Sequence, residues 1–283
     1  EKPNFVIVQG DTNTALAGCF AASIFNRKQF KNKKEINIVH VEAGLRSFNE
    51  KMPEEINRKI IDQLSNFLFV PTKFDLKNLE NEKLTFNKKV FTVGNTISDI
   101  IKEHIPSTKK NKILIKFKVI KNKYFLVTLH RPETVDNPIK LNKLILDLEK
   151  IGRKFYLNFL FPVHPRTKKI IEKLKIKKLK FIKFINPLEF IDFLTIMKNS
   201  KIIFTDSGGI QEEASLLGVP CITIRDSTER QLSLVNKNNI LTGYDFKKIT
   251  RAVTYFNTKK IKPSKIFGDG MVANRIFGIL KKS

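Results

Sequence analysis

The stretch Lys201-Ile-Ile-Phe-Thr-Asp-Ser-Gly-Gly-Ile-Gln-Glu-Glu-Ala214 joins an apolar run to two glycines and then to a helical pattern. Its residues 201–205 predict a buried strand, and residues 210–217 predict a helix closed by Gly218. The first N–H groups of a helix lack internal partners, and the helix dipole favours negative charge there. This order indicates either a phosphate-binding turn or a tight turn with a capped helix.

Two acidic residues, Glu212 and Glu213, lie just inside this predicted helix. A carboxylate beside a phosphate-binding turn can accept hydrogen bonds from ribose hydroxyls, as in dinucleotide-binding folds. The glycines allow a phosphate to approach the main chain, and Ser207 can cap the helix or donate a hydrogen bond. A nucleotide is therefore the first ligand that the sequence predicts.

The composition limits the class of protein. A chain of 283 residues suffices for one large or two ordinary domains. No apolar run approaches the roughly 18 residues of a membrane helix, and none resembles a signal peptide. Cys19 and Cys221 lie in apolar segments and predict core residues in a reducing compartment, the cytoplasm. Four histidines without a Cys/His cluster argue against structural zinc.

The formal charge of +26 raises the possibility of nucleic-acid binding. The lysines are spread along the chain, however, and the dense stretch at 168–183 alternates them with Ile and Leu, as on a solvated face. No zinc-finger, RRM or KH signature accompanies the charge. We therefore expect no nucleic-acid partner and only a preference for small anionic ligands.

Strands and helices alternate along most of the chain. Strands are predicted at 4–8, 36–41, 67–70, 90–93, 124–129, 155–163, 182–185, 201–205 and 221–224. Helices are predicted at 14–25, 53–66, 72–82, 139–151, 167–174, 188–198, 210–217 and from 274, with a connector at 95–123 that contains a further helix. Such alternation predicts two doubly wound, Rossmann-like α/β domains with parallel sheets. We expect domains at 1–100 and 101–265, and a helix in 266–283 that returns to the first domain.

Polar residues follow most of the predicted strands. Asp11 follows the first strand and Glu42 the second, while Glu54 begins the helix that follows Pro53. Helix capping or the dipole alone can explain Asp11 and Glu54. Three carboxylates at one edge are less easily explained by folding, because like charges held close are costly. They predict proton transfer.

The second predicted domain contributes basic residues at its strand ends. His130-Arg131 follows its first strand and His164-Pro165-Arg166 its second. Arg225 and Arg230 follow the strand at 221–224 and add positive charge. Facing the glycine turn, these residues favour binding of a diphosphate. The sequence thus predicts acid/base chemistry on a nucleotide-linked substrate.

The order and spacing of these motifs resemble those of the non-hydrolysing UDP-N-acetylglucosamine 2-epimerase family. The resemblance rests on 9–13 (QGDTN), 40–46 (HVEAGLR), 53–58 (PEEINR), 93–96 (VGNT), 129–131 (LHR), 163–165 (VHP), 205–214 (TDSGGIQEEA), 225–230 (RDSTER) and 268–270 (GDG). Together these motifs span nearly the whole chain and are far more specific than any one of them.

The resemblance implies a two-domain fold of GT-B type with the ligand cleft between the domains. It implies interconversion of UDP-GlcNAc and UDP-ManNAc through elimination of UDP to a 2-acetamidoglucal and its re-addition, without a metal or nicotinamide cofactor. The product would supply ManNAc units for cell-surface polysaccharide. We also expect a homodimer.

The same resemblance implies a role for each candidate residue. Asp11, Glu42 and Glu54 match the family's acid/base carboxylates, and His130 matches an essential histidine at the diphosphate. Ser207, Gly208 and Gly209 would hold the phosphates and Glu213 the ribose, and Arg230 would also bind the substrate. Arg131 and His164 match positions close to the substrate and to a second, activating UDP-GlcNAc in bacterial members.

Three departures from the family pattern stand out. The family begins with a strand and an arginine-bearing loop, so we expect roughly 80 residues, two or three βα units, to be missing before Glu1 and the first domain to be incomplete. Gln231-Leu232 replaces the usual Pro-Glu after Arg230. Pro132-Glu133-Thr134 follows His130-Arg131 where many members carry Arg-Glu-Asn or Ala-Glu-Asn.

Three alternatives remain open from the sequence. A hydrolysing relative would release ManNAc and UDP, and product analysis separates it from an epimerase. A non-catalytic remnant would bind UDP without turnover. A nucleic-acid binder would show duplex binding with a steep salt dependence.

Overall fold

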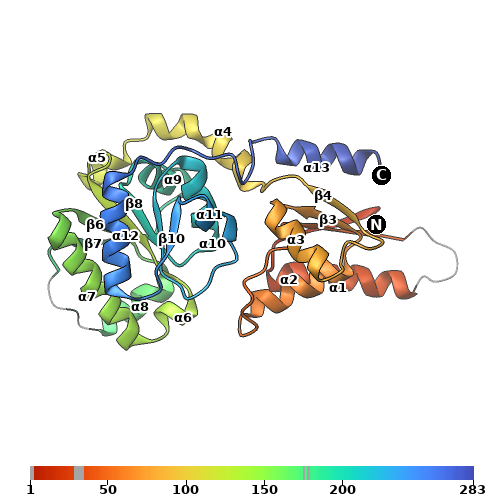
Figure 1. The fold of residues 1–283 in the computed structure, drawn as a ribbon, viewed down its shortest axis with the longest axis horizontal. Coiled ribbons are helices and arrows are strands. Elements are labelled where there is room, and N and C mark those ends of the chain that lie inside the picture. The colour runs from red at the N-terminus through yellow and green to blue at the C-terminus, as the bar shows by residue number, and fades with distance from the viewer. Residues whose placement is uncertain (1–2, 29–34, 175, 177–178) are drawn as a thin grey trace. The chain divides into compact units, whose positions relative to one another are not determined.

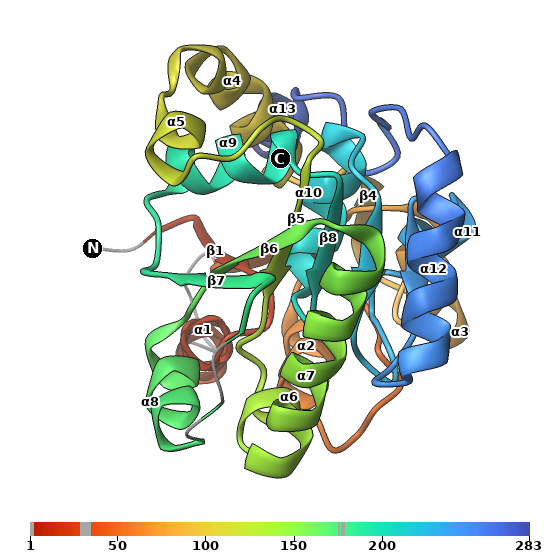
Figure 2. The same ribbon diagram turned by 90° about the vertical axis from the view of Figure 1, so that its left-hand side faces the viewer.

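The computed structural model describes residues 3–28, 35–174, 176 and 179–283. Lys175, Lys177 and Lys178 of the predicted lysine-rich face lie outside the described residues. The chain forms two compact units, residues 1–100 with 265–283 and residues 101–264. Each unit is built around one parallel β-sheet (Figures 1 and 2). The predicted α/β class with two parallel sheets is confirmed.

The first unit holds a four-stranded sheet in the order β1-β2-β3-β4. Its strands are β1 (Phe5–Gln9), β2 (Asn37–Val41), β3 (Phe67–Val70) and β4 (Lys89–Thr92). The connecting helices are α1 (Asn13–Lys28), α2 (Pro53–Leu64) and α3 (Lys73–Asn81), and the C-terminal α13 (Val272–Lys281) belongs to this unit. Because neighbouring strands are consecutive, right-handed crossovers place α1, α2 and α3 on one face.

Alternation along β3 explains how both faces of this sheet are covered. Phe67 and Phe69 pack with Val272 and Ile276 of α13. Leu68 and Val70, which point the other way, pack with Leu79 of α3. A run that is apolar at every position is what a strand buried on two faces requires.

The second unit holds six parallel strands in the order β10-β9-β8-β5-β6-β7. The strands are β5 (Tyr124–Thr128), β6 (Asn158–Pro162), β7 (Ile182–Ile185), β8 (Ile202–Thr205), β9 (Cys221–Thr223) and β10 (Asn239–Leu241). The helices are α4 (Ile97–Lys110), α5 (Ile113–Phe117), α6 (Pro132–Val135), α7 (Pro138–Phe155), α8 (Pro165–Lys173), α9 (Phe190–Asn199), α10 (Gly208–Leu217), α11 (Gln231–Val235) and α12 (Phe246–Thr258). The first residues of α4 belong to the first unit.

The order of these strands reverses direction between β5 and β8. From β5 the chain builds outward to β6 and β7, then returns to place β8, β9 and β10 on the other side. Helices α7 and α12 pack on one face through Leu148 and Val253 (Figure 2). On the other face, the Tyr124 hydroxyl donates to the carbonyl of Ile196 in α9. Ligands in such sheets bind beyond the carboxyl ends of strands at the reversal point.

Several predicted elements differ from the observed ones. Phe155 ends α7 and is not part of a strand, because the helix continues until Tyr156 adopts a left-handed conformation (φ 52°). Helix α10 begins at Gly208, so both glycines lie in the helix. Elements α5, α6, α11, α12 and β10 were not predicted from the sequence.

Across the part of the chain that the structure describes, no helix combines the length and apolar character needed to cross a membrane.

Gly44 lies in a closely packed part of the first unit, against Asp75 and Leu79. Its φ is +83°, and an added Cβ would lie 2.4 Å from the carbonyl oxygen of Asp75. The left-handed conformation costs a residue with a side chain about 1–2 kcal/mol, and overpacking adds about 1–3 kcal/mol. We therefore expect Gly44→Ala to lower the free energy of unfolding by about 2 kcal/mol or more in urea titrations.

The matched control is Gly278→Ala in α13, where nothing lies within 4 Å of the added Cβ. It should be neutral or stabilising, and equal effects of the two changes would contradict the packing described.

Candidate functional site

In the first unit, the predicted carboxylates emerge from neighbouring strand ends. The last residues of β1 and β2, Gln9 and Val41, are register partners, so Asp11 and Glu42 follow paired strands at the same edge. Glu54 lies in the first turn of α2. The common carboxyl-end placement follows from parallel pairing.

Asp11 is held by two consecutive residues of α2. The buried guanidinium of Arg58 forms an ion pair with its carboxylate, and Asn57 Nδ2 donates to its main-chain oxygen at 2.9 Å. Glu54 lies one turn before Arg58, so the two residues share a helix face. The sequence did not single out Arg58 as a residue that positions Asp11.

Glu55, the neighbour of Glu54, has a different environment. It is fully buried, and its carboxylate accepts hydrogen bonds from the N–H and hydroxyl of Ser47 (both 2.8 Å) and from Arg58 Nη1 (2.7 Å). These contacts fix the loop before α2. Of the two adjacent acids, the half-buried Glu54 is the one with access to solvent.

Glu42 has an unusual backbone conformation. Its φ of 72° lies in the left-handed region that a residue with a side chain rarely adopts. Gln9 Nε2 donates to Glu42 Oε1 at 3.0 Å and to Thr96 Oγ1 at 3.1 Å. Gln9, the last residue of β1, therefore links Glu42 to Thr96, which follows β4. Backbone strain of the kind seen at Glu42 is concentrated at functional sites.

A buried histidine supports the turn that carries Asp11. His40 Nε2 lies 3.0 Å from the carbonyl oxygen of Gly10, and Nδ1 lies 2.6 Å from Asp62 Oδ1. Asp62 is fully buried, and although burial alone raises its pKa, His40 and Arg46 lower it below its usual value. The His40–Asp62 pair ties the Gly10 turn to α2, a contact that sequence reasoning missed.

In the second unit, Ser207 and the two glycines open α10 at the carboxyl end of β8. The side chain of Ser207 makes no capping hydrogen bond to α10, contrary to one of the two roles expected for it. A Cβ at Gly208 would lie 2.1 Å from Glu229 Oε1, whereas one at Gly209 would meet only Glu213 Oε1, at 4.0 Å. Gly208 is therefore required by packing, and Gly209 leaves the helix N-terminus accessible.

The basic residues around this turn are compensated by buried acids. Arg225 Nη1 lies 2.9 Å from Glu229 Oε2, and Arg230 Nε lies 3.0 Å from Glu212 Oε1, with all four side chains buried. Arg225 and Arg230, which are expected to add positive charge, are each paired with a carboxylate, because burying a charge requires a partner of opposite sign. Both arginines instead hold the segment 225–230 against the glycine turn.

His130 and Arg131 lie at the carboxyl end of β5, beside the glycine turn. Asp206 lies 3.2 Å from His130 Nδ1, and Arg131 Nη2 lies 3.9 Å from Glu229 Oε1. The rings of His130 and His164 are 6.2 Å apart between centroids. The structure therefore brings together His130, His164, Arg131 and Ser207–Gly209 at the point where the strand order reverses.

Gln231, where the sequence departs from the family pattern, begins α11. Its Nε2 donates to the carbonyl of Thr228 at 3.0 Å. The Gln231 side chain therefore stabilises the preceding segment, residues 225–230, through this hydrogen bond.

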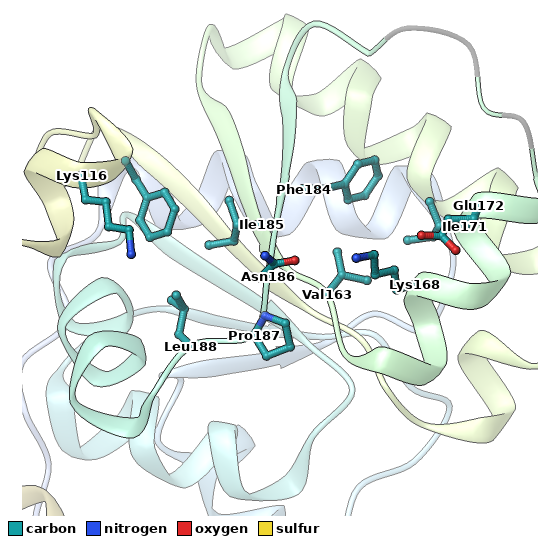
Figure 3. A pocket seen from close by; sticks show the side chains of 11 residues that line it. Lys116, Val163, Lys168, Ile171, Glu172, Phe184, Ile185, Asn186, Pro187 and Leu188 are labelled. Carbon is teal, nitrogen blue, oxygen red and sulfur yellow. The ribbon is translucent and has the colours of Figure 1, made fainter.

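A cavity of about 520 Å³ lies beside β7, the edge strand of the second unit's sheet (Figure 3). It is lined by Val163, which precedes His164, by α5 and α8, by the end of β7 and by the loop 186–188 that follows β7. Its walls are mainly apolar, with Asn186 and Lys168 among the few polar side chains. Concave surfaces of this character at strand ends are where small ligands bind.

Among the described residues, no group of three or more His, Cys, Asp or Glu side chains is arranged to hold a metal ion.

Glu213, the residue predicted to bind ribose, has a perturbed acidity. Loss of surrounding water raises its pKa to about 7 from 4.5. The unfolded chain therefore ionises at lower pH than the native protein. The native state loses relative stability as the pH rises from 4.5 to about 7.

Glu213→Gln should remove this pH dependence. Relative to the original protein, the variant should gain up to about 3 kcal/mol of unfolding free energy between pH 4.5 and pH 8. Urea titrations at both pH values measure the difference, and the exposed Glu189→Gln is the control. A gain that is the same at both pH values would contradict the raised pKa.

Comparison with known proteins shows which family this chain resembles along its length. The family model described as UDP-N-acetylglucosamine 2-epimerase matches residues 1–281. A UDP-N-acetylglucosamine 2-epimerase of Methanococcus maripaludis is 45% identical over 98% of this chain and 76% of its own length.

Two solved structures are similar along the whole chain. One is the UDP-GlcNAc 2-epimerase of Methanocaldococcus jannaschii in complex with UDP-GlcNAc and UDP, with a TM-score of 0.90 and 42% identity over 100% of this chain and 77% of that one. The other is the enzyme of Neisseria meningitidis bound to UDP-GlcNAc, with a TM-score of 0.87 and 31% identity over 99% and 77%. The chain therefore belongs to the UDP-N-acetylglucosamine 2-epimerase family.

Proposed function

We propose that this protein interconverts UDP-GlcNAc and UDP-ManNAc without net hydrolysis. A base removes the proton from C2 while the C1–O bond breaks and UDP departs as the diphosphate. The resulting 2-acetamidoglucal receives a proton on the opposite face of C2, and UDP adds back to C1. Apart from the hydrogen at C2, which exchanges with solvent, every atom of the substrate is retained in the product.

The carboxylates at the strand ends of the first unit supply the proton chemistry in this proposal. Asp11, Glu42 and Glu54 are the acid/base residues in this proposal. The observation that carries it is the placement of Asp11 and Glu42 just beyond the paired ends of β1 and β2, with Glu54 in the first turn of α2. Arg58 and Gln9 orient two of them through the contacts described above. Three carboxylates offer both a base for one face of C2 and an acid for the other.

The residues at the reversal point of the second sheet hold UDP in this proposal. Ser207, Gly208 and Gly209 present the N-terminus of α10 to the phosphates. His130, Arg131 and His164 surround the departing diphosphate, and Glu213 accepts hydrogen bonds from the ribose. Arg230 acts through Glu212 by holding the turn in place.

The wider role in this proposal is based on the resemblance to the family. UDP-ManNAc made in the cytoplasm supplies ManNAc units for cell-surface polysaccharide. The enzyme acts as a homodimer, and a second UDP-GlcNAc bound near Arg131 and His164 activates it.

Substitution of the proposed acid/base and diphosphate residues tests the site. Asp11→Asn, Glu42→Gln and His130→Ala should each lower kcat by at least about 100-fold, the usual range for losing acid/base catalysis. The circular dichroism spectrum should be unchanged. Glu50→Gln, at an exposed carboxylate in the same unit, should retain full activity. Near-normal rates in all three variants would show that the site is wrongly assigned.

The products and their isotope content test the reaction. Incubation of UDP-GlcNAc in D₂O should give UDP-ManNAc with deuterium at C2, detected by NMR. Release of free ManNAc and UDP as the main products would instead establish the hydrolysing reaction. UDP-ManNAc without deuterium would argue against proton abstraction at C2. Binding of UDP with no turnover of UDP-GlcNAc would identify a non-catalytic protein.

A further inference from the structure

Asp206 connects the two strands at which the order of the second sheet reverses. It is the first residue after β8 and its side chain is fully buried. Beyond the end of β5, the neighbouring strand, lies His130, 76 positions earlier in the sequence. A buried carboxylate is costly unless its oxygens accept hydrogen bonds.

Three groups of the segment 130–131 satisfy Asp206. Its Oδ2 accepts the main-chain N–H of His130 at 3.1 Å and that of Arg131 at 3.0 Å. Its Oδ1 lies 3.2 Å from the main-chain nitrogen of His130 and 3.2 Å from Nδ1 of the imidazole. One carboxylate therefore fixes both the main chain and the ring of His130.

The chemistry of these groups decides how the ring is protonated. An ionised carboxylate only accepts hydrogen bonds, so the imidazole nitrogen beside it carries the proton. The other nitrogen, Nε2, is then the one available to a ligand. The His130 side chain is 41% exposed, which leaves that nitrogen a route to solvent.

The first unit contains a second histidine–aspartate pair with different surroundings. His40 contacts Asp62 through Nδ1, but its Nε2 lies 3.0 Å from the Gly10 carbonyl oxygen and the ring is fully buried. In that pair both ring nitrogens are occupied by the protein. In the Asp206–His130 pair, Nδ1 is the ring nitrogen that lies beside the carboxylate of Asp206.

We propose that Asp206 is a positioning residue for the epimerase reaction, which holds His130 with Nδ1 protonated and turns Nε2 towards the substrate, where Nε2 takes up a proton and donates it in a hydrogen bond to the departing diphosphate. This inference rests on the proposed role of His130. It assigns to the aspartate of the Asp-Ser-Gly-Gly turn a role separate from the phosphate-binding role of the residues that follow it.

Asp206→Asn tests the proposal while preserving the size of the side chain. We expect kcat to fall by about 100-fold, in the range that follows loss of an oriented acid/base or electrostatic group. The KM for UDP-GlcNAc should change by less than about threefold if binding contacts are unaffected. Asp245→Asn is the matched control, because asparagine caps α12 as well as aspartate does and activity should be unchanged. A rise in KM at unchanged kcat would overturn the proposal.

A double-mutant cycle separates positioning from general support of the fold. If Asp206 acts through His130, adding Asp206→Asn to His130→Ala should cause no further loss of kcat. Multiplicative losses would show that Asp206 acts independently of the histidine. If His130→Ala alone keeps its activity, the proposed function of His130 fails, whatever the result at Asp206.

The ring nitrogens of the original protein provide a readout that needs no variant. The ¹⁵N NMR signals of the neutral His130 ring, assigned by their loss in His130→Ala, should show the Nδ1–H tautomer. Observation of the Nε2–H tautomer would overturn the proposal even if Asp206→Asn failed to fold. Observation of Nδ1–H would support it regardless of whether turnover is measured.

Discussion

Parallel strand pairing is the constraint on which the rest of the structure depends. Because all strands of a sheet run in the same direction, every residue just beyond a strand appears at one edge. In the first unit this brings Asp11 and Glu42 to the ends of paired strands. In the second unit it brings His130 and Ser207 together, although they are far apart in sequence. The chemistry of the chain is therefore concentrated at strand ends.

Buried ion pairs hold these strand ends in place. Arg58 contacts both Asp11 and Glu55, Arg225 contacts Glu229, and Arg230 contacts Glu212. A charge removed from water needs a partner of opposite sign, so each arginine stabilises a particular loop conformation. The large formal charge of +26 gives no indication of this arrangement, since the charges at the site are mutually compensated.

Most of the fold could be predicted from local patterns, and the contacts of the site could not. Strands β3 and β7 were predicted at their observed residues, because apolar runs bounded by turn residues are a strong local signal. Helix α12 was missed although Asp245 caps it and Ile249, Val253 and Phe256 form its buried stripe. The positions of Asp11, Glu42 and His130 at strand ends could be predicted. The partners Arg58, Gln9 and Asp206 could not, because such contacts depend on how distant segments meet in the sheet.

The left-handed backbone of Glu42 has a consequence for how such chains change over time. Holding a residue with a side chain in this conformation costs about 1–2 kcal/mol. Glycine would relieve most of that cost without disturbing the paired strands around it. A duplicated copy released from its chemical task would therefore gain stability by losing this carboxylate. Under the proposed role of Glu42, selection for chemistry has outweighed selection for a more stable fold at this position.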